Sequence, residues 1–230
     1  MTIEDRWNHV VARVEAACRR VGRPASEVTI IAVSKTHPTR AILDAAAAGA
    51  TDFGENYAQE LADKMADVAL APDLAGVVRW HFIGRLQRNK AKLVAGKVAL
   101  IHAVDTVELA EEIAKRAAGV LQPVLLAVNL AGEATKGGVT GDNAAPIARA
   151  IAGVPGIRLD GLMTMPPYSD DPESSRAQFE GLRALRERLV DDLGLPLPVL
   201  SMGMSGDFEV AIECGATHVR VGTAIFGSRA

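Results

Sequence analysis

The sequence predicts a single (β/α)₈ barrel domain over residues 1–230. Eight short apolar runs alternate with stretches of helical periodicity. Helices between consecutive strands favour parallel pairing with right-handed crossovers, and 230 residues with a hydrophobic content of 49% suit one barrel. A doubly wound open sheet is the alternative, but the glycine fingerprint of its dinucleotide-binding turn is missing from the sequence.

An amphipathic helix precedes the first strand, since apolar residues recur on one face until Gly22, with Pro24 just beyond. That face consists of Ile3, Trp7, Val10, Val14, Cys18 and Val21. Strands are expected near Thr29–Ser34, Thr51–Phe53, Trp80–Ile83, Val98–Val104, Val124–Asn129, Arg158–Met163, Val199–Met202 and His218–Val221. Helices are expected near Arg40–Ala48, Tyr57–Ala69, Arg88–Ala95, Val107–Ala118, Asn143–Ala152, Glu173–Asp192 and Phe208–Glu213. Only seven helices follow strands, so the N-terminal helix can fill the eighth place in the outer ring.

Composition argues against several classes of partner. The formal net charge is only −3, which does not favour binding to nucleic acid. The charged N-terminus lacks the apolar core of a signal peptide, and no apolar run approaches the ~20 residues of a membrane span. Cys18 and Cys214 lack metal-like spacing, so we expect buried reduced thiols and no metal site. We expect a cytoplasmic monomer without membrane contact.

Lys35 closes the first apolar run and would stand at the mouth of the barrel. Desolvation there would disfavour the ammonium form and lower the lysine pKa, which makes the amine a nucleophile able to form a Schiff base. The alternative is a solvated lysine that marks the end of a strand.

Barrels commonly hold phosphate in the loops after strands seven and eight. After strand seven the chain has the small-residue turn 201–207, and after strand eight it has Gly222 and Thr223, where backbone N–H groups can approach an oxyanion. Ser205 in the first turn could instead be a helix cap.

Period-two alternation places Arg220 on the inward face of strand eight, beside Lys35 on strand one. A buried arginine needs an acceptor, which could be a ligand, or Asp105 or Glu55 in an internal ion pair. A reactive lysine, a phosphate cradle and an arginine together point to an aldehyde that bears a phosphate. Pyridoxal 5′-phosphate fits all three.

Several segments closely resemble the pyridoxal phosphate homeostasis proteins, nearly end to end and in order. They are Ala32–Pro38, Phe53–Tyr57, Trp80–Gly84 with Leu86-Gln87 and Asn89-Lys90, Gly161–Met165, Leu200–Ser205 and Val219–Gly227. That family resembles the barrel domain of alanine racemase but lacks the second, β-rich domain of the racemase.

The resemblance implies that Lys35 holds pyridoxal 5′-phosphate as a covalent aldimine and that Arg220 faces the pyridine nitrogen. It also implies phosphate contacts from Ser205, Gly222 and Thr223, and ring contacts from Asn56, His81 and Met163. These last three have structural alternatives, as a helix cap, a hydrogen-bonded core histidine and barrel filling respectively. The match is weaker at Arg85 and in the Ala131–Gly141 loop, where Lys136 is a second amine expected to keep a high pKa.

The resemblance implies a protein of intracellular vitamin B6 homeostasis that holds the cofactor and supplies it to pyridoxal-phosphate-dependent apoenzymes through transient contacts, without turnover. One alternative is an amino-acid racemase-like enzyme, and another is a Schiff-base aldolase that acts on a sugar phosphate. Racemisation needs an acid/base group on each face of the ring, and a lysine serves only one. The chain stops at Ala230 without the racemase's second domain, and its only tyrosines are Tyr57 and Tyr168, so we expect no robust activity.

Overall fold

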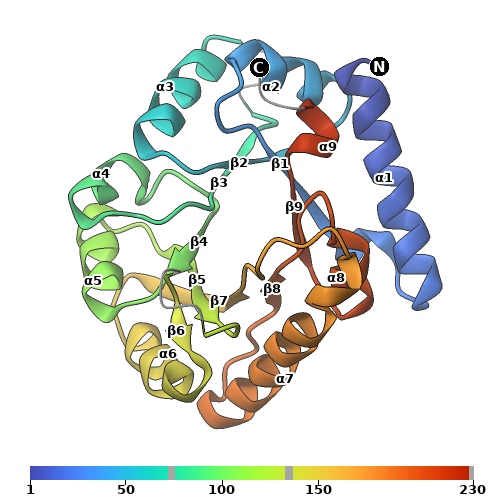
Figure 1. Cartoon of the computed structure of the whole chain (residues 1–230). Helices are drawn as coiled ribbons and strands as arrows, with labels where there is room; N and C mark the ends of the chain where they lie inside the picture. The colour runs from blue at the N-terminus through green and yellow to red at the C-terminus, as the bar shows by residue number, and fades with distance from the viewer. Residues whose placement is uncertain (72–75, 133–136, 228–230) are drawn as a thin grey trace.

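The computed structural model describes residues 1–71, 76–132 and 137–227, and eight parallel strands close a barrel within them (Figure 1). The barrel strands are β1 (Thr29–Val33), β2 (Asp52–Glu55), β3 (Arg79–Phe82), β4 (Leu100–Val104), β5 (Gln122–Asn129), β7 (Ile157–Met163), β8 (Val199–Ser201) and β9 (His218–Val221). The β1–β9 pairing, in which Thr29 lies opposite His218, brings the two ends of the sheet together. The predicted (β/α)₈ barrel is confirmed.

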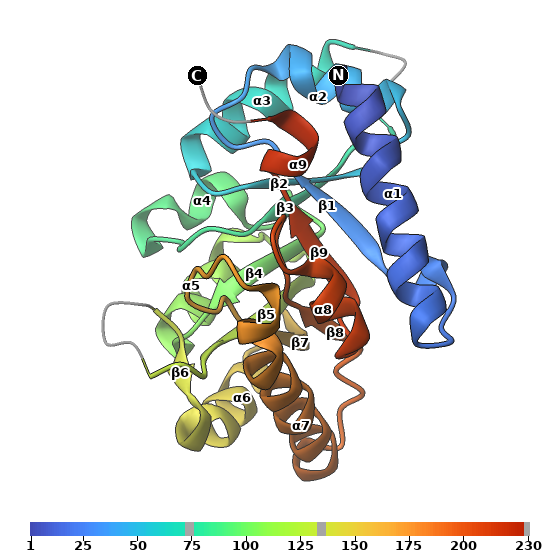
Figure 2. The ribbon, with the colours of Figure 1, turned by 45° about the vertical axis from the view of Figure 1, so that its right-hand side comes forward.

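Helices surround the barrel on all sides (Figures 1 and 2). They are α1 (Ile3–Arg20), α2 (Thr39–Ala47), α3 (Ala58–Ala69), α4 (Ala91–Val94), α5 (Val107–Arg116), α6 (Ala144–Ala152), α7 (Arg176–Leu193), α8 (Phe208–Glu213) and α9 (Thr223–Phe226). Helix α1 packs between α2 and α8, so the N-terminal helix takes the eighth place in the ring as predicted. Thr2 caps it, with a reciprocal hydrogen bond between Thr2 and Asp5.

One strand and one α-helix of the described chain were not predicted from the sequence. Strand β6 (Val139–Thr140) pairs with the end of β5 outside the barrel, and α9 forms directly after β9. In addition, the predicted helix at Arg88–Ala95 is a 3₁₀ turn, η2 (Arg88–Lys90), followed by the single turn α4.

The main core lies between the strands and the helices. Its fully buried aromatic residues include Phe53, Phe82 and Phe179. Cys18 and Cys214 are both buried and unpaired, and burial raises the pKa of each thiol. Buried reduced thiols were predicted here. Among the described helices, none is both long and apolar enough to cross a bilayer.

The inside of the barrel is partly polar. Besides apolar residues such as Ile31 and Leu125, it buries histidine, aspartate, serine and arginine side chains on β2, β3, β4, β8 and β9. A barrel interior is usually filled by branched apolar side chains. Polar groups at this depth must be hydrogen-bonded to one another or to a ligand.

Candidate functional site

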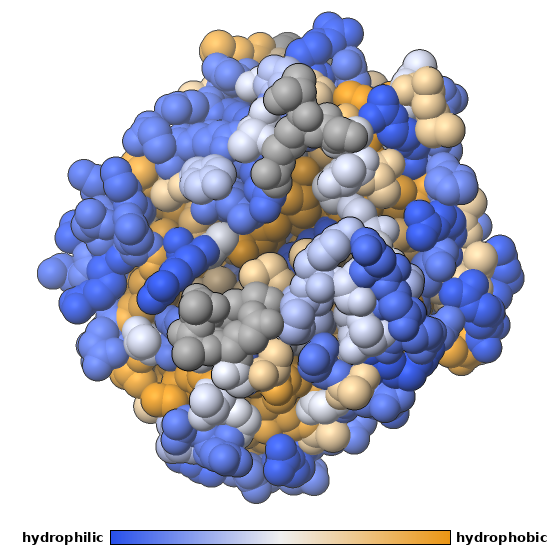
Figure 3. Space-filling view, in the orientation of Figure 1, coloured by the Kyte–Doolittle hydropathy of each residue, from blue (hydrophilic) through white to orange (hydrophobic). Residues whose placement is uncertain are grey.

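A cavity of about 310 Å³ opens at the carboxyl ends of the strands. Six residues singled out from the sequence line it, namely Lys35, Asn56, Ser205, Arg220, Gly222 and Thr223. The space-filling view shows a hollow near the centre of this face, with hydrophobic atoms inside a hydrophilic rim (Figure 3). The wall is therefore mixed, as small-molecule sites commonly are.

Lys35 lies two residues after the end of β1, and hydrogen bonds fix the residue on either side of it. Those of Ser34 are buried. The Ser34 hydroxyl donates to Glu55 Oε1 (2.7 Å), and Lys64 Nζ lies 2.7 Å from both Glu55 Oε1 and the Ser34 carbonyl oxygen. On the C-terminal side of Lys35, the backbone N–H of Thr36 donates to Glu60 Oε1 (2.6 Å).

Thr36 has φ +66°, an unfavourable conformation for a residue with a Cβ. Such a conformation persists only where its surroundings hold it. Glu60, which also accepts from Lys64 Nζ at 2.7 Å, supplies that hold. The position of Lys35 at the cavity is therefore set from outside the barrel by β2 and α3.

The loops after β8 and β9 meet at Ser205. Its Oγ accepts from the backbone N–H groups of Gly222 (3.2 Å) and Ala224 (3.3 Å). A Cβ on Gly222 would lie 3.3 Å from the Val33 carbonyl oxygen, so a glycine suits the close approach of this loop to β1. Ser205 does not cap α8, whose N-cap is Asp207, but its hydroxyl accepts from an N–H group in the first turn of α9.

Arg220 is buried beneath the cavity, and its guanidinium donates to Ser201 Oγ (2.6 Å) and to the Thr164 carbonyl oxygen (3.0 Å). Burial lowers its pKa to about 10, so Arg220 is cationic at neutral pH. The alternative of an internal ion pair with Glu55 or Asp105 is wrong. Glu55 instead pairs with Lys64, and Asp105 accepts from the backbone N–H of Gly138 (3.2 Å).

The residues that line the cavity in the described chain do not include His81 or Met163. His81 is buried inside the barrel, between Asp52 Oδ1 (2.8 Å) and His102 Nε2 (3.0 Å), which matches its alternative as a hydrogen-bonded core histidine. Met163 is the last residue of β7, opposite Ser201. Lys136 lies outside the described residues.

Asn56 is not a helix cap, because Tyr57 occupies the N-cap position of α3. Within the described chain its Oδ1 is a buried acceptor without a hydrogen-bond partner. An acceptor in the wall of a cavity, with no donor from the protein, suits a ligand that carries a donor.

Several lining residues were not singled out from the sequence. They include His37, whose ring stacks on Phe226 at 5.1 Å, and Met165 in the loop after β7. Tyr168, on the same loop, also lines the cavity, is 87% exposed and donates its hydroxyl to Asp170 Oδ1 (2.7 Å). That hydrogen bond raises the pKa of Tyr168. Position in a loop after a strand was the available signal for His37 and Met165, whereas Tyr168 was named from the sequence as one of the two tyrosines.

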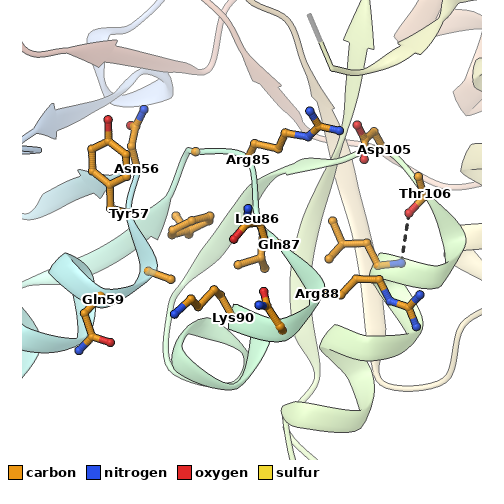
Figure 4. Close-up of a pocket in the computed structure, with 15 residues that line it drawn as sticks. Asn56, Tyr57, Gln59, Arg85, Leu86, Gln87, Arg88, Lys90, Asp105 and Thr106 are labelled. Carbon is orange, nitrogen blue, oxygen red and sulfur yellow. Dashed lines mark hydrogen bonds between the residues drawn. The ribbon is translucent and has the colours of Figure 1, made fainter.

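A second pocket, of about 1120 Å³, lies beside the cavity and shares Asn56 with it (Figure 4). Its wall includes Arg85, Arg88 and Lys90 from the loop after β3 and from η2, all exposed. Figure 4 shows Arg85 extending toward Asp105. We favour the smaller cavity as the ligand site, because its arginine is held by buried contacts and the residues on either side of its lysine are fixed by hydrogen bonds.

The described residues hold no cluster of histidine, cysteine and carboxylate side chains suited to a metal ion. Lys35, Arg220 and the backbone after β9 surround the same cavity. An amine, a cation and backbone donors form a set that suits a phosphorylated aldehyde.

Comparison with known proteins agrees with this geometry. The family model described as alanine racemase, N-terminal domain, matches residues 9–230. A pyridoxal phosphate homeostasis protein of Aquifex aeolicus is 45% identical over 227 residues, which cover 98% of this chain and 97% of the relative. A protein of the same name from Escherichia coli K12 is 40% identical and covers 94% of this chain and 92% of its own.

Solved structures give the same result. PipY of Synechococcus elongatus PCC7942, solved with PLP bound, has a TM-score of 0.82 and 34% identity, covering 98% of this chain and all (100%) of PipY. Alanine racemase from Corynebacterium glutamicum has a TM-score of 0.67 and 18% identity, covering 97% of this chain and 62% of the racemase, which shows likeness of fold alone. The chain therefore belongs to the family of the alanine racemase N-terminal domain and, within it, to the pyridoxal phosphate homeostasis proteins.

Proposed function

We propose that this protein binds pyridoxal 5′-phosphate as a Schiff base at Lys35, acts in vitamin B6 homeostasis and supplies the cofactor to apoenzymes. The observation that carries the proposal is the convergence of Lys35, Arg220 and the Gly222–Thr223 loop on one cavity of about 310 Å³. The names of the relatives and the PLP in the PipY structure support it.

The residues present fit this group in three respects. Lys35 is partly buried at the cavity, so its amine can meet an aldehyde there. Ser205, Gly222 and Thr223 would hold the phosphate. The Ser205 hydroxyl, whose oxygen accepts from the N–H groups of Gly222 and Ala224, could donate its hydrogen to a phosphate oxygen, and Gly222 allows a close approach of the backbone. The Asn56 acceptor without a partner would face the bound ring.

Each residue has a definite chemical task. Lys35 Nζ would add to the aldehyde carbon, and loss of one water would leave a C=N bond without any oxidation or reduction. Arg220 would face the pyridine nitrogen and, as a cation that cannot accept a proton, would keep that nitrogen unprotonated. Bound pyridoxal phosphate ordinarily acts as an electron sink, and an unprotonated ring nitrogen weakens that capacity.

A role as carrier rather than enzyme follows from this arrangement. A weak electron sink suits holding and release of the cofactor better than turnover of an amino acid. The relatives are named as homeostasis proteins, and their names describe no enzyme. We propose that contacts with apoenzymes are transient and occur at the cavity face, where the cofactor would leave.

The first experiment locates the Schiff base. The visible spectrum of the purified protein with added pyridoxal 5′-phosphate is recorded, and the adduct is then reduced with borohydride and mapped by peptide mass. We expect a coloured protein with the modification on Lys35, and Lys35→Ala should lose the reducible adduct with an unchanged circular dichroism spectrum. Lys136→Ala is the control and should change little.

Two results would contradict this assignment. Modification chiefly on Lys136 would show that the lysine after β1 does not hold the cofactor. A protein that stays colourless after addition of pyridoxal 5′-phosphate would instead favour an aldolase in which the loops after β8 and β9 hold the phosphate of a sugar.

The second experiment tests supply. The loaded protein is mixed with an apoenzyme that depends on pyridoxal phosphate, together with a scavenger of free cofactor, and the recovery of enzyme activity is followed. Direct supply predicts recovery faster than with an equal amount of free cofactor under the same scavenger. Equal recovery rates would mean that the protein only stores the cofactor.

A further inference from the structure

A continuous row of hydrogen bonds crosses the inside of the barrel and ends at Arg220. It begins at the first residues of β2 and β3, where the Arg79 side chain is 61% exposed. Its contacts are Arg79 Nη2 to Asp52 Oδ2 (2.8 Å), Asp52 Oδ1 to His81 Nε2 (2.8 Å), His81 Nδ1 to His102 Nε2 (3.0 Å), His102 Nδ1 to Ser201 Oγ (2.8 Å) and Ser201 Oγ to Arg220 Nη1 (2.6 Å). The middle members are buried.

The two ends of the row restrict where its hydrogens lie. Arg220 can only donate, and an ionised Asp52 can only accept. Burial raises the pKa of Asp52, but hydrogen bonds from His81, Arg79 and Thr51 outweigh this and hold the pKa well below its usual value. Burial also lowers the pKa of His102 well below 6.5, so its ring is neutral and carries one N–H.

When His81 is neutral, only one assignment of donors and acceptors along the row is possible. His81 donates from Nε2 to Asp52, so its bare Nδ1 accepts from the Nε2–H of His102. The bare Nδ1 of His102 then accepts the Ser201 hydroxyl hydrogen, and Ser201 Oγ accepts from Arg220. Every link then holds one hydrogen.

A proton on His81 reverses the central part of the row. His81 then also donates from Nδ1, so His102 must accept at Nε2 and carry its hydrogen on Nδ1. Ser201 Oγ would accept from both His102 and Arg220, and its own hydroxyl hydrogen would point away from His102. Protonation of His81 thus changes the hydrogen bonding of the Ser201 hydroxyl, which accepts from Arg220 in both states. The charged and titratable groups around His81 are Asp52, Arg79, His102, His218 and, beyond Ser201, Arg220.

We propose that Asp52, His81, His102 and Ser201 are positioning residues for Arg220, and that they form a relay whose direction is set by the proton on His81. The role of Arg220 toward a bound ligand rests on the proposed function, whereas the direction of the relay is a property of the protein alone. The relay thus connects the tautomer of His81 with the arginine at the cavity.

Asp52→Asn tests the relay, because Arg79 and Thr51 determine how the new amide is oriented and therefore which atoms of the row donate. Both donate to Oδ2 of Asp52, so an asparagine must place its carbonyl there and its NH₂ toward His81. His81 would then accept at Nε2 and donate from Nδ1, and His102 would follow. The substitution should therefore reverse the row at neutral pH.

The readout is the ¹⁵N NMR spectrum of the histidine rings in labelled protein without added ligand. We expect Nε2–H tautomers for His81 and His102 in the wild type at pH 8 and Nδ1–H tautomers for both in Asp52→Asn. His218→Gln is the matched control, since the His218 ring lies 6.1 and 6.2 Å from the other two rings and its Nδ1 contacts Thr217 instead. It should leave both tautomers unchanged.

The affinity for pyridoxal 5′-phosphate is measured on the same variants. A reversed row should weaken binding about 3- to 10-fold in Asp52→Asn relative to His218→Gln. Unchanged tautomers in a folded Asp52→Asn would overturn the relay, and changed tautomers with the affinity of the control would overturn the positioning role. A wild type that binds no pyridoxal 5′-phosphate would refute the proposed function and leave the tautomer result intact.

A second measurement tests the relay in the wild-type protein, so it can be made even if Asp52→Asn does not fold. The wild-type protein is titrated from pH 8 to pH 5, and the two ring nitrogens of His102 are followed by ¹⁵N NMR. The relay predicts that the hydrogen on His102 moves from Nε2 to Nδ1 as His81 takes up a proton. A change at His81 without any change at His102 would overturn it.

Discussion

Replacing Lys64 by methionine should destabilise the protein strongly and more at neutral than at acidic pH. Lys64 Nζ lies 2.7 Å from Glu55 Oε1, Glu60 Oε1 and the Ser34 carbonyl oxygen, and the side chains of Lys64 and Glu55 are 6% and 0% exposed. The methionine keeps the length of the side chain but leaves Glu55 as a buried carboxylate without a cation.

The size of the effect follows from this burial. Removal of one partner from a buried ion pair typically costs about 3–5 kcal/mol, because the other charge stays behind. In a domain of this size each 1 kcal/mol lowers the melting temperature by about 2–4 °C, so a loss on the order of 10 °C is expected. Exposed Lys115 on α5 supplies the control, and Lys115→Met should stay within about 0.5 kcal/mol of wild type.

The pH dependence separates the ion pair from simple packing. Burial already raises the pKa of Glu55, against hydrogen bonds from Lys64 and Ser34. Without the cation, Glu55 should accept a proton more readily, and a folded state that binds the extra proton gains stability as the pH falls. The deficit of Lys64→Met should therefore shrink between pH 7.5 and pH 5.

Urea denaturation of the wild type, Lys64→Met, Glu55→Gln and the double variant at both pH values measures this directly. The double variant should be more stable than Lys64→Met at pH 7.5, because it no longer buries a charge. A deficit below about 1 kcal/mol, or one that is the same at both pH values, would refute the reasoning.

Three further outcomes are expected. Ser205→Ala should weaken binding of pyridoxal 5′-phosphate by about 1–3 kcal/mol in a spectrophotometric titration, and unchanged affinity with a lower melting temperature would assign the hydroxyl to bracing the loops alone. Burial lowers the pKa of His218 to about 4, so between pH 6.5 and 4 the unfolded chain binds a proton that the folded chain does not. Acidification through this window should therefore remove about 3 kcal/mol of stability. The loss should be smaller in His218→Gln, and equal losses in both proteins would exclude His218 as its source. Loaded protein in D₂O should not exchange the Cα hydrogen of L- or D-alanine, or of a panel of other amino acids, over many turnovers, whereas exchange that disappears in Tyr168→Phe would make the protein an enzyme.

Local patterns were sufficient to predict most of the fold. Helix α8 has the bounds predicted from the sequence, and β9 does as well. Each has an apolar face that the period of the sequence reveals. Strand β6 escaped prediction because two residues carry no period, and Val139 becomes a strand only by pairing with Val128.

The candidate site was predictable only where strand ends determine it. Lys35 and Arg220 follow from alternation and from the closure of the barrel between β1 and β9. Lys64 has the sequence context of an ordinary surface lysine on an amphipathic helix, and only packing of α3 on β2 buries it. His102 has no local signal for its contact with Ser201, 99 positions away.

Two hydrogen-bond networks bear on the proposed role as a carrier of the cofactor. One, through Glu55 and Lys64, fixes the backbone on both sides of Lys35, and the other fixes Arg220 from below. Among the described residues the tyrosine at this cavity is Tyr168, whose hydroxyl is exposed and donates to Asp170, a bond that raises its pKa. A phenol in that state is a poor general base at neutral pH, and racemisation needs groups on both faces of the ring. On the proposed function, we therefore expect the cofactor to be bound without proton exchange at the Cα of an amino acid.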